Sequence, residues 1–142
     1  MNIEDLDDVQ LLTGLLRGET EGENFVGKCA VACVARNRVN NNHWPNNFRE
    51  VILQPKQFSC FNSLPREGEI PEKLFKRFFT SHEDGWWREC RFAAWGVIFN
   101  WYRDFTKGAN LYWNQDIVTP DWDWDKVEIL DKFGKHQFAR EI

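Results

Sequence analysis

The stretch that decides the fold runs from residue 15 to residue 39 and reads LLRGETEGENFVGKCAVACVARNRV. An apolar helical pattern ends near Gly18, and an Ala-rich helical pattern begins just after Asn24. Glu19 lies at the junction of the two patterns, where its side chain can face a cleft and still be shielded by the core. Such a position is typical of a carboxylic acid that donates a proton in a reaction.

The helices on either side of this junction are predicted from apolar periodicity and capping residues. The first spans about residues 5–17, and the second spans about residues 25–40 with Asn24 as its N-cap. The buried face of the second helix is predicted to be a stripe of Val31, Val34, Ala35 and Val39. A short helix follows Asn47 and is ended by Pro55.

The second half of the chain changes from helical to strand-like patterns. Pro71 opens a further helix, because proline suits the first helical turn. A long helix over about residues 86–105, carrying Phe92 and Trp101, is predicted to be the central core helix. Gly134 separates the last two of three short expected strands, over about residues 110–114, 127–130 and 137–139.

Length and composition favour one globular domain over residues 1–142, of the α+β class, mainly helical, with a small C-terminal sheet or hairpin. The net charge of −4 argues against a nucleic-acid partner, because phosphate binding requires a basic surface. No apolar run approaches the roughly 18 residues that cross a bilayer, so we expect no membrane insertion. The acidic N-terminus lacks the pattern of a secretory signal, which predicts synthesis in the cytoplasm.

The four cysteines, Cys29, Cys33, Cys60 and Cys90, are expected to be reduced thiols that lie mostly in the core, with a disulfide as the alternative. Their spacing with histidine does not match a zinc site, so no metal is predicted. The eight tryptophans are the compositional outlier. Most of these rings should be core, although Trp113, Trp122 and Trp124 are also candidate platforms for stacking on a sugar.

Several short motifs occur in the order found in one known family. They are Gly18-Glu19-Thr20-Glu21-Gly22-Glu23, Asn37-Arg38-Val39, Gln57-Phe58-Ser59, Tyr112-Trp113-Asn114 and Gly134-Lys135-His136-Gln137-Phe138. On these motifs the chain resembles the bacterial and phage cell-wall hydrolases named for the spore cortex-lytic enzyme SleB. The resemblance covers about residues 10–140.

The resemblance implies a lysozyme-like fold that cleaves peptidoglycan between N-acetylmuramic acid and N-acetylglucosamine. It implies that the family's catalytic glutamate is Glu19. It also suggests lytic transglycosylase chemistry, in which the muramyl 6-hydroxyl closes a 1,6-anhydro ring and no water attacks. No cofactor or metal is then needed, and peptidoglycan glycan strands are the expected partner.

Other chemistries remain open at this stage. A muramidase would cut the same bond with water, and an amidase or peptidase would cut elsewhere in the wall. A glycan-binding or virion structural protein could keep the fold without catalysis. A catalytic domain with neither signal nor anchor suggests a phage product, either an endolysin or a virion-associated lysin, with other virion proteins as partners in the second case.

The substrate-binding candidates are polar or aromatic side chains in the family-like motifs, namely Gln57, Ser59, Tyr112, Trp113 and Asn114. Glu21 and Glu23 are expected to be solvated or to cap the second helix. His136 is expected to pack near the cleft or to orient a neighbour, and a Cys60–His136 peptidase pair is a weak alternative.

Two parts of the chain depart from the family pattern, so their roles are harder to assign. Tyr112-Trp113-Asn114-Gln115 stands where the family often has Tyr-Asn-Pro, and the segment over residues 68–85, rich in charge and Phe, has no clear counterpart. Arg38 matches the family's Asn-Arg pair and is expected to form buried hydrogen bonds.

Overall fold

The computed structural model describes residues 1–55, 57–80 and 85–142. Its helices are α1 (Asp8–Glu19), α2 (Phe25–Val39), α3 (Phe48–Ile52), α4 (Glu72–Phe78) and α5 (Gly85–Ile98), with single 3₁₀ turns η1 (Ile3–Asp5), η2 (Ser59–Phe61) and η3 (Trp124–Lys126). The strands are β1 (Leu111–Trp113), β2 (Val127–Phe133) and β3 (His136–Glu141). The predicted α+β class, mainly helical with a small C-terminal sheet, is confirmed. The 68–85 segment contains α4, and its residues 81–84 lie outside the described residues.

The two helices around Glu19 begin at side-chain caps. Asp7 caps α1 by accepting a hydrogen bond from the Gln10 backbone nitrogen, so the helix begins at Asp8, later than predicted. Asn24 caps α2 as predicted, accepting from the backbone nitrogen of Gly27. The helix α1 ends at Glu19 itself, and five residues separate it from the start of α2.

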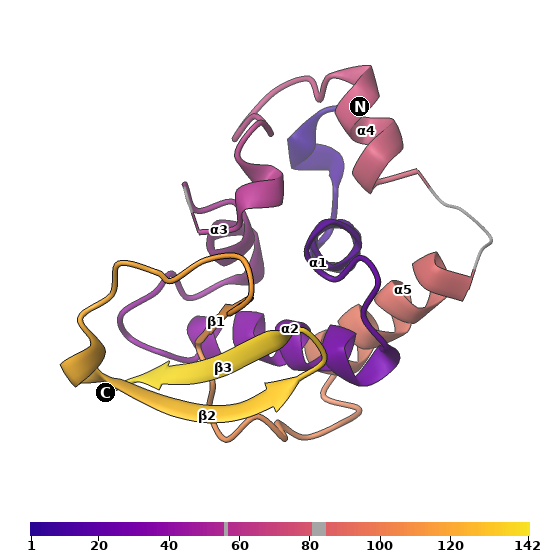
Figure 1. Cartoon of the computed structure of the whole chain (residues 1–142). Coiled ribbons are helices and arrows are strands. Elements are labelled where there is room, and N and C mark those ends of the chain that lie inside the picture. The colour runs from indigo at the N-terminus through magenta and orange to yellow at the C-terminus, as the bar shows by residue number, and fades with distance from the viewer. Residues whose placement is uncertain (56, 81–84) are drawn as a thin grey trace.

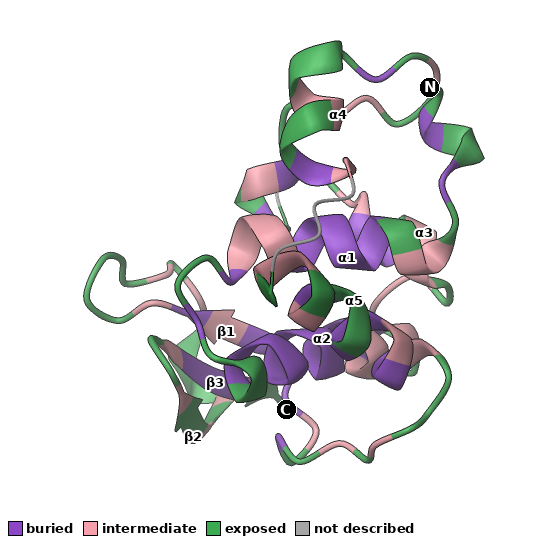
Figure 2. Cartoon of the chain, turned by 90° about the vertical axis from the view of Figure 1, so that its right-hand side faces the viewer, coloured by how far each residue is buried: buried purple, intermediate pink, exposed green. Residues whose placement is uncertain are grey.

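The predicted core residues of α2 are confirmed, since Val31, Val34 and Ala35 are buried and Val39 packs against the core, but the buried surface extends beyond one stripe. Every residue from Gly27 to Ala35 is buried. Figure 2 shows buried residues concentrated on α1, α2 and β3, while α4 and β2 are largely exposed. Small Ala and Cys side chains suit this central position, because neighbouring elements can approach the helix closely.

The helix α1 lies between α3, α4 and α5, as the end-on view of α1 in Figure 1 shows. Gly14 allows this packing, since a Cβ there would fall 2.5 Å from a ring carbon of Phe79, just beyond α4. Phe61, Phe78 and Phe79 cluster beside α1, with the rings of Phe61 and Phe78 edge-on at 5.1 Å. The charge- and Phe-rich segment therefore supplies part of the core.

The prediction that one long helix over 86–105 forms the central core helix is wrong. The helix α5 ends at Ile98, and Asn100 adopts a left-handed backbone conformation with φ of 57°. The chain then folds back, so that the ring of Tyr102 occupies the space above Gly96 and its hydroxyl donates to the Ala93 carbonyl at 2.7 Å. Two aromatic residues of the expected core helix are exposed, Phe92 within α5 (54%) and Trp101 beyond its end (62%).

The C-terminal sheet is antiparallel, with strand order β1-β3-β2. A register shift lies in β2 between Ile129 and Lys132, and the side chain of Gln137 donates there to the Leu130 and Asp131 carbonyls. Phe138 of β3 joins the same buried cluster as the helices. The sheet is thus fixed against α2, and β1 and β3 form one side of the site described next. Among the described residues, no helix combines the length and the apolarity needed to cross a bilayer.

Candidate active site

A cleft of about 400 Å³ lies where the end of α1, the turn η2 and the strand β1 meet. The structure brings all six predicted site residues to it. Its lining consists of Glu19, Arg38, Gln57, Ser59, Leu111, Tyr112, Trp113, Asn114, Val118, Pro120, Trp122 and His136. Polar side chains from three distant parts of the sequence therefore face one space.

Glu19 is held at the edge of the cleft by the close approach of η2 to α1. A Cβ at Gly18 would lie 2.7 Å from the sulfur of Cys60, so only glycine permits this approach. The backbone nitrogen of Cys60 then donates to Glu19 Oε1 at 3.4 Å. Glu19 is half-buried and faces the cleft, and the same contact brings Ser59 beside it.

Tyr112 lines the cleft together with Glu19. Its ring packs between Phe58 and Phe138, and edge-on against His136 at 5.2 Å. The hydroxyl is buried and has no hydrogen-bond partner among the described residues. Burial, and next the negative charge of Glu19, raise the pKa of Tyr112 well above its ordinary value. This neutral hydroxyl is therefore available to donate to a bound molecule.

The Asn37-Arg38 pair of α2 positions the strand that carries Tyr112. The side chain of Asn37 donates to the Ala109 carbonyl at 2.9 Å, and Nε of Arg38 donates to the Asn110 carbonyl at 2.8 Å. Arg38 is 4% exposed, and its guanidinium lies 5.0 Å from the ring centre of Phe58. The expected role of Arg38 in buried hydrogen bonding is confirmed, and its Nη1 also reaches Gln57 Oε1 at 3.5 Å.

The remaining predicted site residues differ in how accessible they are. Ser59 and Gln57 are exposed, so their polar groups can reach a ligand. Oδ1 of Asn114 accepts a hydrogen bond from the backbone nitrogen of Asp116. The side-chain amide nitrogen of Asn114 is then the group that can donate to a ligand.

The aromatic wall of the cleft belongs to a cluster of three tryptophans, two of which line the cleft. Trp113, Trp122 and Trp124 have their ring centres 5.3–5.4 Å apart. Trp113 is only 8% exposed, which fits an anchor of the wall better than a stacking platform. Trp122 is half-exposed and lines the cleft, whereas Trp124 does not line it.

Glu23 is a site residue that the sequence reasoning missed. The expectation that it is solvated is wrong, because its side chain is 3% exposed. Oε1 of Glu23 accepts from the backbone nitrogen of Lys135 at 2.8 Å and lies 3.2 Å from Nδ1 of His136. This carboxylate therefore ties the start of α2 to the β2–β3 turn, beside the cleft.

His136 lines the cleft, as the sequence predicts, and Glu23 orients its ring. Burial lowers the pKa of His136, although the charge of Glu23 opposes this effect. With Nδ1 facing the carboxylate of Glu23, a neutral ring carries its proton on Nδ1 and leaves Nε2 as an acceptor. His136 is thus fixed in one orientation between Glu23 and Tyr112.

Gly134 is the sequence signal that could have revealed the buried Glu23. A Cβ at position 134 would fall 1.7 Å from Glu23 Oε2, and the backbone φ there is +59°. Lys28 supports the same segment, since its buried ammonium donates to the Glu23 carbonyl at 2.6 Å and pairs with Glu89 at 3.2 Å.

The other candidate chemical groups do not enter the cleft or are not reactive there. Glu21 is exposed as predicted, and Asp116 is exposed in the loop after β1. Glu19 is the only carboxylate among the described residues that line the cleft. Burial, and next the charge of Glu19, strongly raise the pKa of the Cys60 thiol, which argues against a cysteine nucleophile. Within the described ranges, no three His, Cys, Asp or Glu side chains are placed to hold a metal ion.

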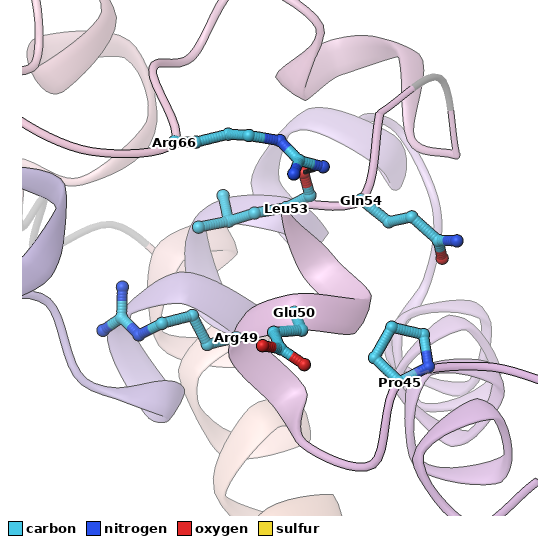
Figure 3. A pocket seen from close by; sticks show the side chains of 6 residues that line it. All are labelled: Pro45, Arg49, Glu50, Leu53, Gln54 and Arg66. Carbon is cyan, nitrogen blue, oxygen red and sulfur yellow. Dashed lines mark hydrogen bonds between the residues drawn. The ribbon is translucent and has the colours of Figure 1, made fainter.

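A separate hollow of about 420 Å³ lies beside α3, and it is lined by Pro45, Arg49, Glu50, Leu53, Gln54 and Arg66 (Figure 3). Its cations already have structural partners. Arg49 donates to the carbonyls of Ile3 and Leu6, and Arg66 donates to the Leu53 carbonyl at 3.2 Å. These hydrogen bonds hold the N-terminal segment against α3 and connect Arg66 to the end of that helix. The two arginines of this hollow therefore have structural roles, and we assign no ligand to it.

The fold resembles solved structures of two catalytic domains. One is the catalytic domain of the germination-specific lytic transglycosylase SleB from Bacillus anthracis, with a TM-score of 0.71, 29% identity and coverage of 94% of this chain and 93% of that chain. The other is the catalytic domain of the Bacillus cereus SleB protein, with a TM-score of 0.70, 28% identity and coverage of 94% and 89%.

Curated sequences give the same relationship. The chain is 31% identical over 137 residues to a spore cortex-lytic enzyme of Bacillus cereus, and 30% identical over 133 residues to that of Bacillus subtilis. The alignments cover 94% of this chain but only 44% and 37% of those proteins, so the chain spans less than half their length. Residues 22–139 match the pattern of one family, and the chain belongs to that family, Cell Wall Hydrolase.

Proposed function

We propose that this protein cleaves the glycan strands of peptidoglycan between N-acetylmuramic acid and N-acetylglucosamine, with Glu19 as the general acid. The observation that carries the proposal is that the half-buried carboxylate of Glu19 and the Tyr112 hydroxyl, which has no hydrogen-bond partner among the described residues, line the same cleft. Glycoside cleavage requires an acid that protonates the leaving oxygen, followed by stabilisation of an oxocarbenium-like centre. Glu19 supplies the proton in this scheme.

The number of carboxylates favours a lytic transglycosylase. Most hydrolytic glycosidases use two carboxyl groups about 5–9.5 Å apart. Among the described residues that line this cleft, Glu19 is the only one with a carboxylate. One carboxylate suffices when the muramyl 6-hydroxyl is the nucleophile. Glu19 protonates the glycosidic oxygen, the 6-oxygen bonds to C1, and the hydroxyl proton returns to Glu19, so no water is consumed. The Bacillus anthracis relative is itself described as a lytic transglycosylase.

The surrounding polar groups have roles that this chemistry needs. Tyr112 donates its hydroxyl hydrogen to a sugar oxygen near the cleaved bond. Asn114, Gln57 and Ser59 hold acetamido and hydroxyl groups of the sugars on either side. His136, fixed by Glu23, positions Tyr112 and is not itself the acid.

The test is mass spectrometry of purified peptidoglycan digested with the wild type, with Glu19→Gln and with Glu21→Gln as the matched control. We expect 1,6-anhydro-muropeptides from the wild type and from Glu21→Gln, and none from Glu19→Gln. Products with reducing ends would establish a hydrolytic muramidase with the same acid. Freed peptides would indicate an amidase or peptidase. Absence of soluble products from every protein would indicate a non-catalytic glycan-binding protein.

The biological setting is a further proposal. A phage endolysin or virion-associated lysin, made in the host cytoplasm and acting at the cell wall, stays a prediction from the sequence. Detection of the chain in purified virions would favour the virion-associated role, and its release only at lysis would favour the endolysin role.

A further inference from the structure

A second groove, of about 550 Å³, lies between the first half of α1 and the exposed side of α5. It is lined by Asp7, Val9, Gln10, Thr13, Phe78, Phe79, Trp87, Arg91, Trp95 and Phe99, and shares no lining residue with the cleft. Asp7 caps the start of α1 and Glu19 ends it, so about 18 Å of helix separates the two at 1.5 Å per residue. A molecule bound here would not occupy the site of cleavage.

Aromatic rings form one side of this groove, and a cation is stacked between two of them. The guanidinium of Arg91 lies 5.2 Å from the ring centre of Trp87 and 4.3 Å from that of Trp95. Trp95 is half-buried, and Phe99 is 58% exposed. Trp101, packed edge-on against Trp95 at 5.9 Å, extends the aromatic surface beyond the groove. Flat exposed rings of this kind can stack on the apolar face of a sugar.

Polar groups are placed among these rings in fixed positions. Asp7 and Gln10 form the capping box of α1, which uses one oxygen from each side chain and holds both at the rim. Within the described part of the chain, Arg91 forms no hydrogen bond, so its N–H groups can serve a ligand.

Thr13 gives an independent indication of a ligand. It is 5% exposed, and its hydroxyl has no hydrogen-bond partner among the described residues. Buried hydroxyl groups are nearly always paired, so an unpaired one that lines a groove calls for a partner beyond the described residues. The hydroxyl or acetamido group of a sugar would provide that partner.

We propose that this groove is a second glycan-binding site that holds a peptidoglycan strand away from the cleavage cleft. An apolar protein segment would offer no hydrogen-bond partner to Thr13 or Arg91, and a nucleic acid would meet a chain of net charge −4. A neutral, hydroxyl-rich ring satisfies both the aromatic faces and the polar groups. The identity of the glycan rests on the proposed function, since peptidoglycan is the substrate proposed there.

The test uses tetra-N-acetylchitotetraose and the indole N–H signals of Glu19→Gln in NMR spectra, assigned by single Trp→Phe replacements. We expect two separate groups of signals to shift, those of Trp113 and Trp122 in the cleft and those of Trp87 and Trp95 in the groove. Shifts in the cleft alone would overturn the second site and leave the proposed function standing. Shifts in the groove alone would support the second site and count against the proposed function.

Substitutions then test the groove directly, through sedimentation with insoluble peptidoglycan in the Glu19→Gln background. We expect Trp95→Ala to weaken binding about tenfold and Thr13→Val, which keeps the shape, about fivefold. Ile129→Ala, which removes an exposed apolar group on β2, is the matched control and should bind as Glu19→Gln does. If Trp95→Ala fails to fold, Thr13→Val and Arg91→Gln carry the test. Unchanged binding by these two variants would overturn the proposal.

Discussion

The two sides of the cleft are built in different ways. The α1 side comes from local sequence, because the Asp7 cap, the apolar face and Gly18 together place Glu19 at the end of one helix. The sheet side comes from long-range contacts, because Tyr112 and His136 are positioned by Asn37, Arg38 and Glu23 from α2 and the segment before it. In the proposed function, the first side supplies the acid, and the second side supplies the groups that hold the substrate against it.

Two carboxylates four residues apart show the same contrast. Glu19 is half-buried and faces the cleft, and its Oε1 accepts a hydrogen bond from the Cys60 backbone nitrogen at 3.4 Å. Glu23 is almost fully buried and is engaged by Lys135 and His136. A carboxylate that reacts must remain accessible, whereas one that braces a fold must be paired. The difference in accessibility therefore supports the proposal that Glu19 is the acid, whereas the contacts of Glu23 give it a structural role.

The largest effect on stability should follow from Gly134→Ala. The new methyl group would overlap the Glu23 carboxylate, and the left-handed backbone at this position is strained for any other residue. We expect a loss of about 3 kcal/mol in the free energy of unfolding, measured by denaturant titration. Gly68→Ala is the matched control, because Gly68 also has positive φ but has open space around it. It should cost only about 1 kcal/mol, and equal losses in the two variants would contradict the role given to Gly134.

Tyr112→Phe should separate activity from stability on the sheet side. The variant removes a hydroxyl that has no partner in the described structure, so the free energy of unfolding should stay the same or rise. The rate of peptidoglycan cleavage should fall about tenfold to a hundredfold.

Tyr102→Phe provides the opposite pattern as a control. The hydroxyl of Tyr102 donates to the Ala93 carbonyl at 2.7 Å, so its loss should cost about 1 kcal/mol and leave the rate unchanged. A Tyr112→Phe variant with the wild-type rate would remove Tyr112 from the site.

A smaller effect is expected when the pH is lowered. Burial lowers the pKa of His136 below that of the unfolded chain, so the unfolded state binds the proton more readily. The stability contributed by the neutral ring is present above the unfolded pKa of about 6.5 and is lost as the pH falls through the lower folded value. Glu23, Glu19 and Lys135 are the charged groups that act on this ring.

Thermal unfolding between pH 8 and pH 5 measures this dependence. We expect the Tm of the wild type to fall over this range, and to fall less in His136→Gln. A steeper fall in His136→Gln would show that the ring is stabilised in its charged form.

Local signals in the sequence predicted much of this arrangement. The Asn24 cap, the Gly134 turn and the six residues brought together in the cleft all follow from short motifs. The missed features depend on contacts between distant residues. Glu23 is bonded to a residue 112 positions later, and α5 ends where Tyr102 folds back over Gly96. In both cases a glycine marks the close approach, but the sequence does not reveal which side chain occupies the space.

The most direct test of the account is a side-by-side measurement of cleavage rate and Tm in Glu19→Gln and Glu23→Gln. We predict that Glu19→Gln loses about two to four orders of magnitude in rate and keeps the wild-type Tm. We predict that Glu23→Gln has a lower Tm, by several degrees, and keeps its rate within about tenfold because the acid is intact. The reverse pattern, with an active Glu19→Gln and an inactive Glu23→Gln of unchanged Tm, would contradict the assignment of the acid.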